Sequence, residues 1–344
     1  MGKKLCCFIV PYFGKLPNYF QLFLNSCSLN PGYHWLIITD DDTPYIYPKN
    51  VQRVKSSFEE LQTTFSSKFD FDICLPKPYK LCDFKPAYGY LFSEYLKDYD
   101  FWGHCDIDTI MGCLENFIPK DFLFRYDKVF CLGHMTIYRN EDCINKLFML
   151  PYKGRSLYKL VFQNPKICVF DEEFQDGNNV NRMFIQSGKK VYMHDASLNF
   201  STKHRDFRKI SFNGIDDITD AADYVIEPSC TSLTVWDNGH LFRYLYDKTI
   251  SRKEYPYVHL QQRKMTFNKR VFKADKYKIV PNRFDILEVE NITACSFKQI
   301  SLKSYDIGYY KYLIRRIYKA IMRRLKLIKE NKENYEIDDN HTRL

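Results

Sequence analysis

Short apolar runs alternate with segments of helical spacing along the N-terminal part of the chain. The apolar runs predict buried strands at residues 5–10, 35–38, 51–54, 99–105, 129–132 and 135–138. Between them, the spacing of apolar side chains predicts helices at residues 18–27, 57–65 and 85–97. Ser57, with Glu60 three residues later, is a capping-box pattern that marks a helix start. Strands that alternate with helices predict an α/β fold whose sheet is largely parallel in this part.

The pattern becomes less regular from about residue 198 to residue 285. Short apolar pieces at residues 232–236 and 257–260 predict further strands. Asp237-Asn238-Gly239, directly after the first of these pieces, predicts a hairpin turn. We therefore expect a mixed sheet flanked by helices, with the irregular pieces added after the α/β units.

Three segments that could contact a ligand follow predicted strands. They are Pro11–Gly14, Thr39–Asp42 and Asp106–Asp108. In parallel sheets, ligands bind at the carboxyl ends of the strands. Two aspartates separated by one residue of extended chain point to the same side, and such oxygens suit Mg²⁺ or Mn²⁺. The alternative is an ordinary strand end, where aspartate is frequent.

Three further segments contain residues that could carry chemistry. Lys80, Asp83 and Lys85 lie before the helix that leads to Asp106, where they could contact phosphate or sugar. The alternative is a solvated helix start, with Asp83 as its cap and Pro86 at an early position.

His259 ends an apolar strand and is followed by Arg263 and Lys264. A neutral imidazole could be a third metal ligand, and the cations could neutralise phosphate oxygens. The alternative is a partly buried strand histidine.

Asp171 and Glu172 lie between aromatic residues. A carboxylate here could orient an acceptor hydroxyl or take its proton. The alternative is a helix N-terminus, where acidic residues are favoured by the helix dipole.

Composition narrows the class of protein. The 344 residues include 45% hydrophobic residues, enough for a folded core. The twelve cysteines are scattered without a Cys-x-x-Cys, which predicts reduced thiols in a cytoplasmic protein rather than a disulfide framework. The N-terminal apolar run is too short for a signal peptide, and no stretch reaches the length of a spanning helix.

Charge is concentrated near the C-terminus. The formal net charge is +9, and eight basic but no acidic residues lie between Lys311 and Lys329. Residues 309–329 are predicted to form a basic amphipathic helix, which suits an anionic membrane surface. The alternatives are a helix that packs on its own domain or on a partner subunit. No recognised nucleic-acid-binding motif accompanies the charge, so nucleic acid is not expected as a partner.

The chain resembles bacterial GT-A-type glycosyltransferases of a little-characterised family from capsule and exopolysaccharide gene clusters. The resemblance runs from residue 5 to about residue 285, and its marks are Pro11–Pro17, Lys80–Ala87, the Asp-x-Asp at Asp106 and Asp108, and His259–Lys264. It implies a GT-A-like (Rossmann-type) domain over residues 1–286 and a separate C-terminal extension over residues 287–344. The oligomeric state is left open.

The resemblance also implies a site and a reaction. Asp106, Asp108 and His259 would hold Mn²⁺ or Mg²⁺, with His259 within bridging reach of the two aspartates. The donor, a UDP- or GDP-sugar, would lie against these residues: Pro11, Tyr12, Phe13, Gly14, Asp40, Lys80, Asp83, Lys85, Arg263 and Lys264. Asp171 and Glu172 would face a saccharide or lipid-linked acceptor, and the pattern is closer to retaining than to inverting enzymes. Two rivals are a metal-dependent nucleotidyl- or phosphotransferase and a non-catalytic scaffold in a polysaccharide complex.

Overall fold

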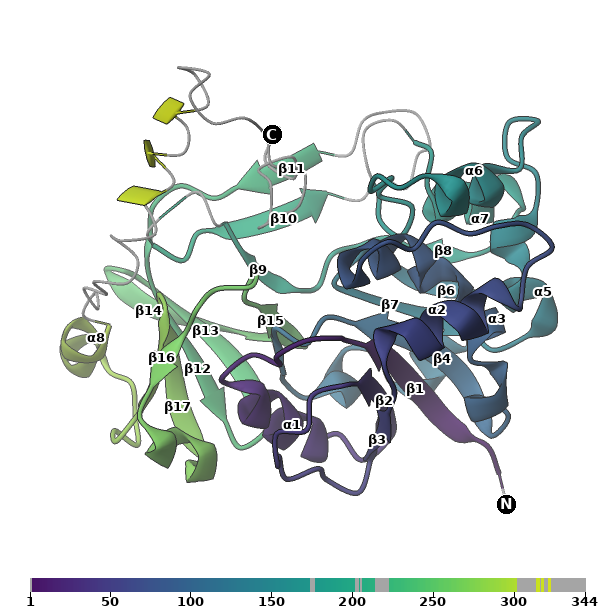
Figure 1. Cartoon of the computed structure of the whole chain (residues 1–344). Helices are drawn as coiled ribbons and strands as arrows, with labels where there is room; N and C mark the ends of the chain where they lie inside the picture. The colour runs from purple at the N-terminus through teal and green to yellow at the C-terminus, as the bar shows by residue number, and fades with distance from the viewer. Residues whose placement is uncertain are drawn as a thin grey trace.

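The structure is a computed structural model that describes residues 2–173, 177–201, 204, 206–213, 223–301, 314–315, 317–318 and 321–322. Over these residues the strands form three sheets of seven, six and five strands, and helices cover the largest sheet (Figure 1). The chain therefore has the mixed α/β architecture that the sequence predicts.

The main sheet has the strand order β3-β2-β1-β4-β7-β6-β8. Its strands are β1 (Lys4–Pro11), β2 (Tyr33–Thr39), β3 (Val51–Lys55), β4 (Tyr99–Cys105), β6 (Lys128–Leu132), β7 (Met135–Arg139) and β8 (Val191–Tyr192). β1 is parallel to β2 and β4, and β2 is parallel to β3, whereas β7 is antiparallel to β4 and β6. The parallel arrangement predicted for the N-terminal part is confirmed.

Alternating side chains of β1 supply both faces of the main sheet. Ile9 packs in one core cluster with Leu61 and Phe65 of α2 (Phe58–Ser66). Phe8 packs in the other with Phe20 of α1 (Phe20–Ser28). Because strand side chains alternate, a strand buried on both faces reads as a continuous apolar run.

The capping box at the start of α2 is confirmed. The Glu60 N–H donates to Ser57 Oγ at 3.1 Å, and the Ser57 N–H donates to Glu60 Oε2 at 2.9 Å. These bonds satisfy two of the N–H groups that a helix start leaves without partners.

The helix predicted at residues 85–97 is replaced by three shorter pieces. These are the 3-10 segment η1 (Pro78–Ala87), α3 (Tyr88–Leu91) and the 3-10 segment η2 (Ser93–Tyr95). Pro86 has no N–H for a helical bond. Gly89 lies against the Trp102 ring so closely that a Cβ there would stand 2.4 Å from it. The prediction of one continuous helix was therefore wrong.

Two smaller sheets, mostly antiparallel, accompany the main sheet. The six-stranded sheet comprises β14 (Thr249–Tyr255), β13 (His240–Asp247), β12 (Thr231–Asp237), β17 (Lys276–Val280), β18 (Arg283–Ile286) and β16 (Thr266–Phe267), in that order. Asn238 and Gly239 connect β12 to β13 with φ of 47° and 87°, so the predicted hairpin turn is confirmed. The five-stranded sheet comprises β11 (Asp223–Ile226), β10 (Lys209–Asn213), β9 (Leu198–Phe200), β15 (Tyr257–His259) and β5 (Thr109–Met111).

Short helices fill the connections. They are η3 (Leu114–Asn116), α4 (Lys120–Leu123), α5 (Asp142–Asn145), η4 (Leu147–Met149), α6 (Leu157–Gln163), α7 (Val180–Gln186), η5 (Lys269–Lys273) and α8 (Ala294–Ile300). In Figure 1, α6 and α7 lie beside the main sheet and α8 lies at the far edge of the six-stranded sheet. Phe297 of α8 is buried, and its ring stacks on that of Tyr246 at 5.5 Å.

Most of the helix predicted at residues 309–329 lies outside the described residues. The six residues of this range that are described are helical. Among them Ile314, Ile317, Tyr318 and Ile321 are exposed, by 65%, 52%, 57% and 49%. Nowhere in the described parts of the chain is there a helix both long and apolar enough to cross a membrane.

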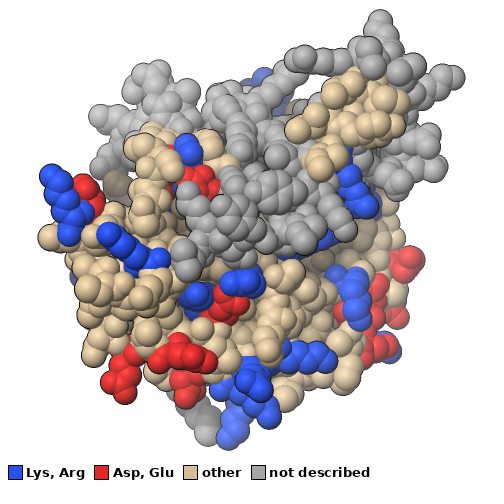
Figure 2. Space-filling view, turned by 90° about the vertical axis from the view of Figure 1, so that its left-hand side faces the viewer, with Lys and Arg blue, Asp and Glu red and all other residues tan. Residues whose placement is uncertain are grey.

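The twelve cysteines carry free thiols, and those in β1, α1, β4 and β6 are buried. Acidic and basic side chains are interspersed over the face of the molecule seen in Figure 2. Among the described residues this face therefore shows no field of a single sign.

Candidate functional site

Three ligand-type side chains converge where β4 ends. Nε2 of His259 lies 3.4 Å from Oδ1 of Asp108 and 3.8 Å from Oδ2 of Asp106. One ligand atom from each of the three residues lies within 4.8 Å of the other two. The structure thus brings together the three residues predicted as metal ligands.

A strand pairing that is remote in sequence causes this convergence. Asp106 follows β4, and Asp108 directly precedes β5. β15 pairs antiparallel with β5, with His259 opposite Thr109. The Leu260 N–H donates to the Asp108 carbonyl at 2.9 Å and extends the pairing past the aspartate. His259 is therefore placed by backbone hydrogen bonds and not by its side chain alone.

The donor set fits a divalent cation. In each aspartate, one carboxylate oxygen accepts a hydrogen bond from the protein: Asp106 Oδ1 from Lys85, and Asp108 Oδ2 from the Gln262 N–H. The other oxygen of each carboxylate lies near Nε2 of His259. The remaining oxygens and Nε2 have the spacing of atoms that share one ion. Burial raises the pKa of Asp108, but His259 and the hydrogen bonds outweigh it and lower the pKa overall. The carboxylate is therefore ionised, as a ligand must be.

Lys85 joins this group to a second one. Its ammonium donates to Asp106 Oδ1 at 2.9 Å and to the Gly133 carbonyl at 2.8 Å, and it lies 3.4 Å from Asp171 Oδ2. Burial opposes the charge, but Asp106 and Asp171 raise the pKa of Lys85 well above its usual value. Lys85 is thus a fixed positive charge between two groups. One is the metal-type cluster, which consists of Asp106, Asp108 and His259, and the other is the acidic pair, Asp171 and Glu172.

Asp171 and Glu172 have different environments although they are neighbours. Asp171 is buried, and burial raises its pKa to about 8, with Glu172, Asp83 and Asp106 adding to the effect and Lys85 opposing it. Glu172 is partly exposed and accepts the Gly133 N–H at 3.0 Å. A Cβ on Gly133 would stand 2.7 Å from Asp171 Oδ2, so glycine is needed for this close approach.

Lys80 and Asp83 are fully buried and lie behind the site. Lys80 donates to Asp83 at 2.6 Å, to the Lys166 carbonyl at 2.6 Å and to the Val161 carbonyl at 3.1 Å. Asp83 accepts the N–H groups of Cys168 and Phe170 at 2.9 and 3.0 Å. This pair, which was predicted to touch the donor, holds the loop that carries Asp171.

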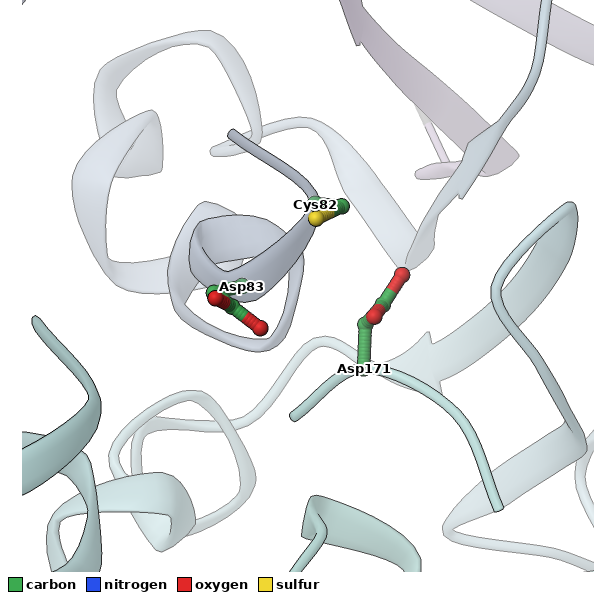
Figure 3. A group of neighbouring side chains, drawn as sticks. All are labelled: Cys82, Asp83 and Asp171. Atoms are coloured by element: carbon green, nitrogen blue, oxygen red, sulfur yellow. The ribbon is translucent and has the colours of Figure 1, made fainter. Parts of the chain in front are cut away.

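Cys82, Asp83 and Asp171 also bring ligand-type atoms within 4.8 Å of one another. In Figure 3, Cys82 and Asp83 come from η1 and Asp171 from the facing loop. Both oxygens of Asp83 already accept hydrogen bonds, and burial raises the pKa of the Cys82 thiol well above its usual value. Metal ligation needs the thiolate. The donor chemistry of this group therefore does not favour a metal.

The predicted nucleoside-side residues lie at the ends of β1 and β2. Gly14 has a φ of 89°, and its N–H donates to Asp40 Oδ1 at 2.7 Å. The Tyr12 hydroxyl donates to the Lys15 carbonyl at 3.3 Å, and burial raises the pKa of Tyr12, with the negative charges of Asp108 and Asp41 adding to this. Phe13 is buried against Phe58. Of this group, Gly14 and Asp40 are the exposed members.

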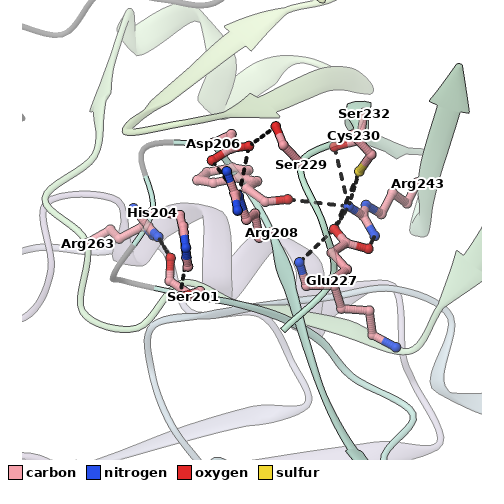
Figure 4. Close-up of polar contacts among 12 residues, drawn as sticks. Ser201, His204, Asp206, Arg208, Glu227, Ser229, Cys230, Ser232, Arg243 and Arg263 are labelled. Atoms are coloured by element: carbon pink, nitrogen blue, oxygen red, sulfur yellow. Dashed lines mark hydrogen bonds and ion pairs between the residues drawn. The ribbon is translucent and has the colours of Figure 1, made fainter. Parts of the chain in front are cut away.

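The turn after β15 is left-handed at two successive residues, Gln261 (φ 55°) and Gln262 (φ 54°). Arg263 is buried beyond it, and its Nη2 donates to the Ser201 carbonyl at 2.5 Å. In Figure 4, the Arg263 side chain points to Ser201, and the Ser201 hydroxyl contacts His204 Nδ1 at 3.1 Å. Lys264, the other predicted phosphate partner, is exposed.

Sequence reasoning missed His134. Its ring lies 4.6 Å from that of His259, and its Nδ1 bonds the Tyr257 hydroxyl at 2.9 Å. Burial lowers the pKa of His134 well below its usual value, and the charge of His259 adds to this, so His134 is neutral. The only sequence signal was Gly133-His134 between two predicted strands.

Comparisons with known proteins give a family but no activity. A protein-family model matches residues 8–288, and its description is a family of unknown function (DUF6625). No curated protein matches the chain. A structure of galactosyltransferase LgtC in complex with donor and acceptor sugar analogs covers 57% of this chain and 76% of its own, with a TM-score of 0.31 and 11% identity. A structure of an active-site mutant of LgtC covers 57% and 75%, with a TM-score of 0.30 and 10% identity. Likeness at this level assigns no activity.

Proposed function

The chain belongs to the family of unknown function DUF6625, and from its candidate site we propose that it is a metal-dependent glycosyltransferase. It transfers a sugar from a UDP- or GDP-sugar to a saccharide or lipid-linked acceptor in surface polysaccharide synthesis. The sequence resemblance to GT-A-type enzymes motivates the reaction class and favours a retaining outcome.

The observation that carries the proposal is the convergence of Asp106, Asp108 and His259 at a strand end. A buried carboxylate and imidazole beside a more exposed carboxylate form a half-open ligand set, with one side left for a substrate. Mn²⁺ or Mg²⁺ bound there would supply Lewis-acid stabilisation of the charge on a departing diphosphate. Asp108 holds its orientation through the Gln262 N–H, and Asp106 holds its own through Lys85.

The donor would lie between this cluster and the ends of β1 and β2. Tyr12 and the exposed Gly14 and Asp40 border the nucleoside, and the exposed Lys264 contributes positive charge for phosphate oxygens. Arg263 adds its charge from a buried position.

Glu172 and Asp171 would have different roles toward the acceptor. Glu172 is the more accessible carboxylate, so it is the group that would accept the proton of an acceptor hydroxyl. Asp171, whose pKa is raised to about 8, is largely protonated at neutral pH and serves as a hydrogen-bond donor. Unequal environments of two neighbouring carboxyl groups commonly separate such roles.

The enzyme would work at the cytoplasmic face of the membrane. The mixed charge of the face in Figure 2 gives no reason for membrane attachment through that face. The basic run between Lys311 and Lys329 and the exposed apolar side chains at 314, 317, 318 and 321 support attachment through residues 309–329.

Calorimetry with UDP and GDP, with and without Mn²⁺, tests the proposal. We expect Mn²⁺-dependent binding of one nucleotide, and a loss of about tenfold or more in Asp106→Asn and Asp108→Asn, since each removes a charged ligand. Asp142→Asn, on the exposed start of α5, is the matched control and should bind as the wild type does.

Two outcomes favour the rivals. Nucleotide binding that does not depend on Mn²⁺, or absence of any binding, supports a non-catalytic scaffold. Mn²⁺-dependent binding without hydrolysis of any member of a nucleotide-sugar panel, together with turnover of a nucleoside triphosphate, supports a nucleotidyl- or phosphotransferase.

A further inference from the structure

A cavity of about 390 Å³ is lined in part by residues 167–169 of the loop that carries Asp171. It is formed by the turn before α6, by α6 itself and by the segment that leads to Asp171. Its lining residues include Lys153, Arg155, Leu157, Val161, Cys168 and Val169. This volume is in the range of small-ligand sites and suits one or two sugar units.

The lining is positively charged. Lys153 and Arg155 are both exposed, and none of the described residues that line the cavity is acidic. Among the described residues neither cation has a carboxylate within ion-pair distance; Lys153 lies over the Tyr152 ring at 5.0 Å. The remaining wall is mostly apolar, through side chains such as Leu157 and Val161. A ligand with an anionic group and an apolar face would match both parts.

Two wall residues have backbone conformations that L-residues rarely adopt. Lys153 has φ of 48° and Val169 has φ of 56°. Left-handed backbone costs on the order of 1 kcal/mol or more for a non-glycine residue, and for β-branched valine it is a marked outlier. Such conformations gather at functional sites, and two further examples, Gln261 and Gln262, lie beside Asp108 of the metal-type cluster.

The cavity wall is coupled to the acidic pair by the buried ion pair behind it. Cys168 of the wall donates its N–H to Asp83, and Asp83 lies within 4.8 Å of a carboxylate oxygen of Asp171. Lys80 holds the Val161 carbonyl of the same wall. One loop, held by this buried ion pair, thus contributes both to the cavity wall and to the proposed acceptor-side carboxylates.

We propose that this cavity binds an acidic sugar unit of the acceptor, with the sugar carboxylate at Lys153 and Arg155. The inference rests on the proposed function and adds the acceptor class, an acidic saccharide. The unit in the cavity is one that precedes the accepting sugar, since the hydroxyl that reacts must reach Glu172, which does not line the cavity.

Binding of acidic oligosaccharides to the full chain tests this inference. The probes are trigalacturonate, a hyaluronan tetrasaccharide and a mannuronate trimer, with cellotriose as the neutral counterpart, all titrated without nucleotide or metal. We expect at least one acidic probe to bind, cellotriose to bind more weakly, and Lys153→Ala/Arg155→Ala to weaken the acidic probe by about tenfold or more, because two charge-assisted hydrogen bonds are lost.

The control is Lys97→Ala/Lys146→Ala, which removes the same charge from two exposed lysines outside the cavity. Equal weakening in this control, equal binding of cellotriose, or no binding of any acidic probe would overturn the inference. Displacement of the acidic probe by an equal concentration of inorganic phosphate would overturn it too, since the cavity would then select an anion and not a saccharide.

The same proteins titrated with Mn²⁺ and UDP or GDP separate the two proposals. Normal nucleotide binding with no preference for acidic saccharides would refute the cavity assignment and leave the proposed function intact. Selective saccharide binding without any nucleotide binding would refute the glycosyltransferase and leave only the saccharide site.

Discussion

At the scale of single residues, burial decides the chemistry of Asp171. Its carboxyl lies within ion-pair distance of Lys85 and yet has a pKa of about 8, because burial and three neighbouring acids outweigh that lysine. An unfolded aspartate titrates near pH 4. The folded state therefore holds this proton more tightly, and the stability that it contributes is present below about pH 4 and lost as the pH rises through about 8.

The stability of the Asp171→Asn variant relative to the wild type should therefore increase as the pH rises. We expect the difference in Tm between the variant and the wild type to shift by several degrees in favour of the variant between pH 5 and pH 9, as measured by thermal unfolding. Glu172→Gln, at the partly exposed neighbour, should show a much smaller dependence. A Tm difference for Asp171→Asn that is the same at both pH values would contradict a raised pKa.

At the scale of elements, the turn after β15 fixes one metal-type ligand at a conformational cost. The Gln262 N–H holds Asp108, whereas the Gln262 side chain is exposed. Since the left-handed φ is needed and the side chain is not, glycine should satisfy this position better than glutamine does.

Gln262→Gly should raise the free energy of unfolding by up to about 1 kcal/mol and leave Mn²⁺ affinity unchanged. Gln262→Pro should weaken Mn²⁺ binding, because proline removes the N–H and cannot adopt this φ. Gln52→Gly, at an exposed position of edge strand β3, is the control and should lower stability by roughly 0.5–1 kcal/mol. Destabilisation of similar size by both glycine variants would show that the turn is not strained.

At the scale of the whole molecule, the site lies where two halves of the chain meet. The pairing of β5 with β15 joins the end of the main sheet to the later strands, and 154 positions separate Asp108 from Gln262, which it holds. The basic segment at residues 309–329 lies beyond the matched family region, residues 8–288.

Removal of residues 309–344 should therefore detach the protein from anionic vesicles without affecting nucleotide binding. Each basic residue near such a surface contributes about 1 kcal/mol, so the loss should be large at low salt and small at high salt. Co-sedimentation with phosphatidylglycerol vesicles measures it, with neutral vesicles and a chain that ends at residue 329 as controls. Unchanged co-sedimentation of the truncated protein would refute attachment through this segment.

Local patterns in the sequence determined much of the fold. The apolar runs of β1, β2 and β4, the capping box at Ser57 and the turn at Asn238-Gly239 depend on neighbours within a few residues. For the same reason the sequence could place Asp106 and Asp108 at a strand end. The segment at residues 85–97 was misread as one helix although Pro86, near its start, lacks the N–H that a helical hydrogen bond needs.

Only the tertiary structure decided which of the candidate residues face one another. Lys80, Asp83 and Lys85 have similar sequence surroundings, yet the first two are sealed behind the loop of Asp171 and the third bridges Asp106 to Asp171. Likewise, His259 reaches the aspartates through the pairing of β5 with β15, and His134 lies against it through the chain reversal after β6. Such contacts depend on burial and long-range strand pairing, which periodicity within a short segment does not encode.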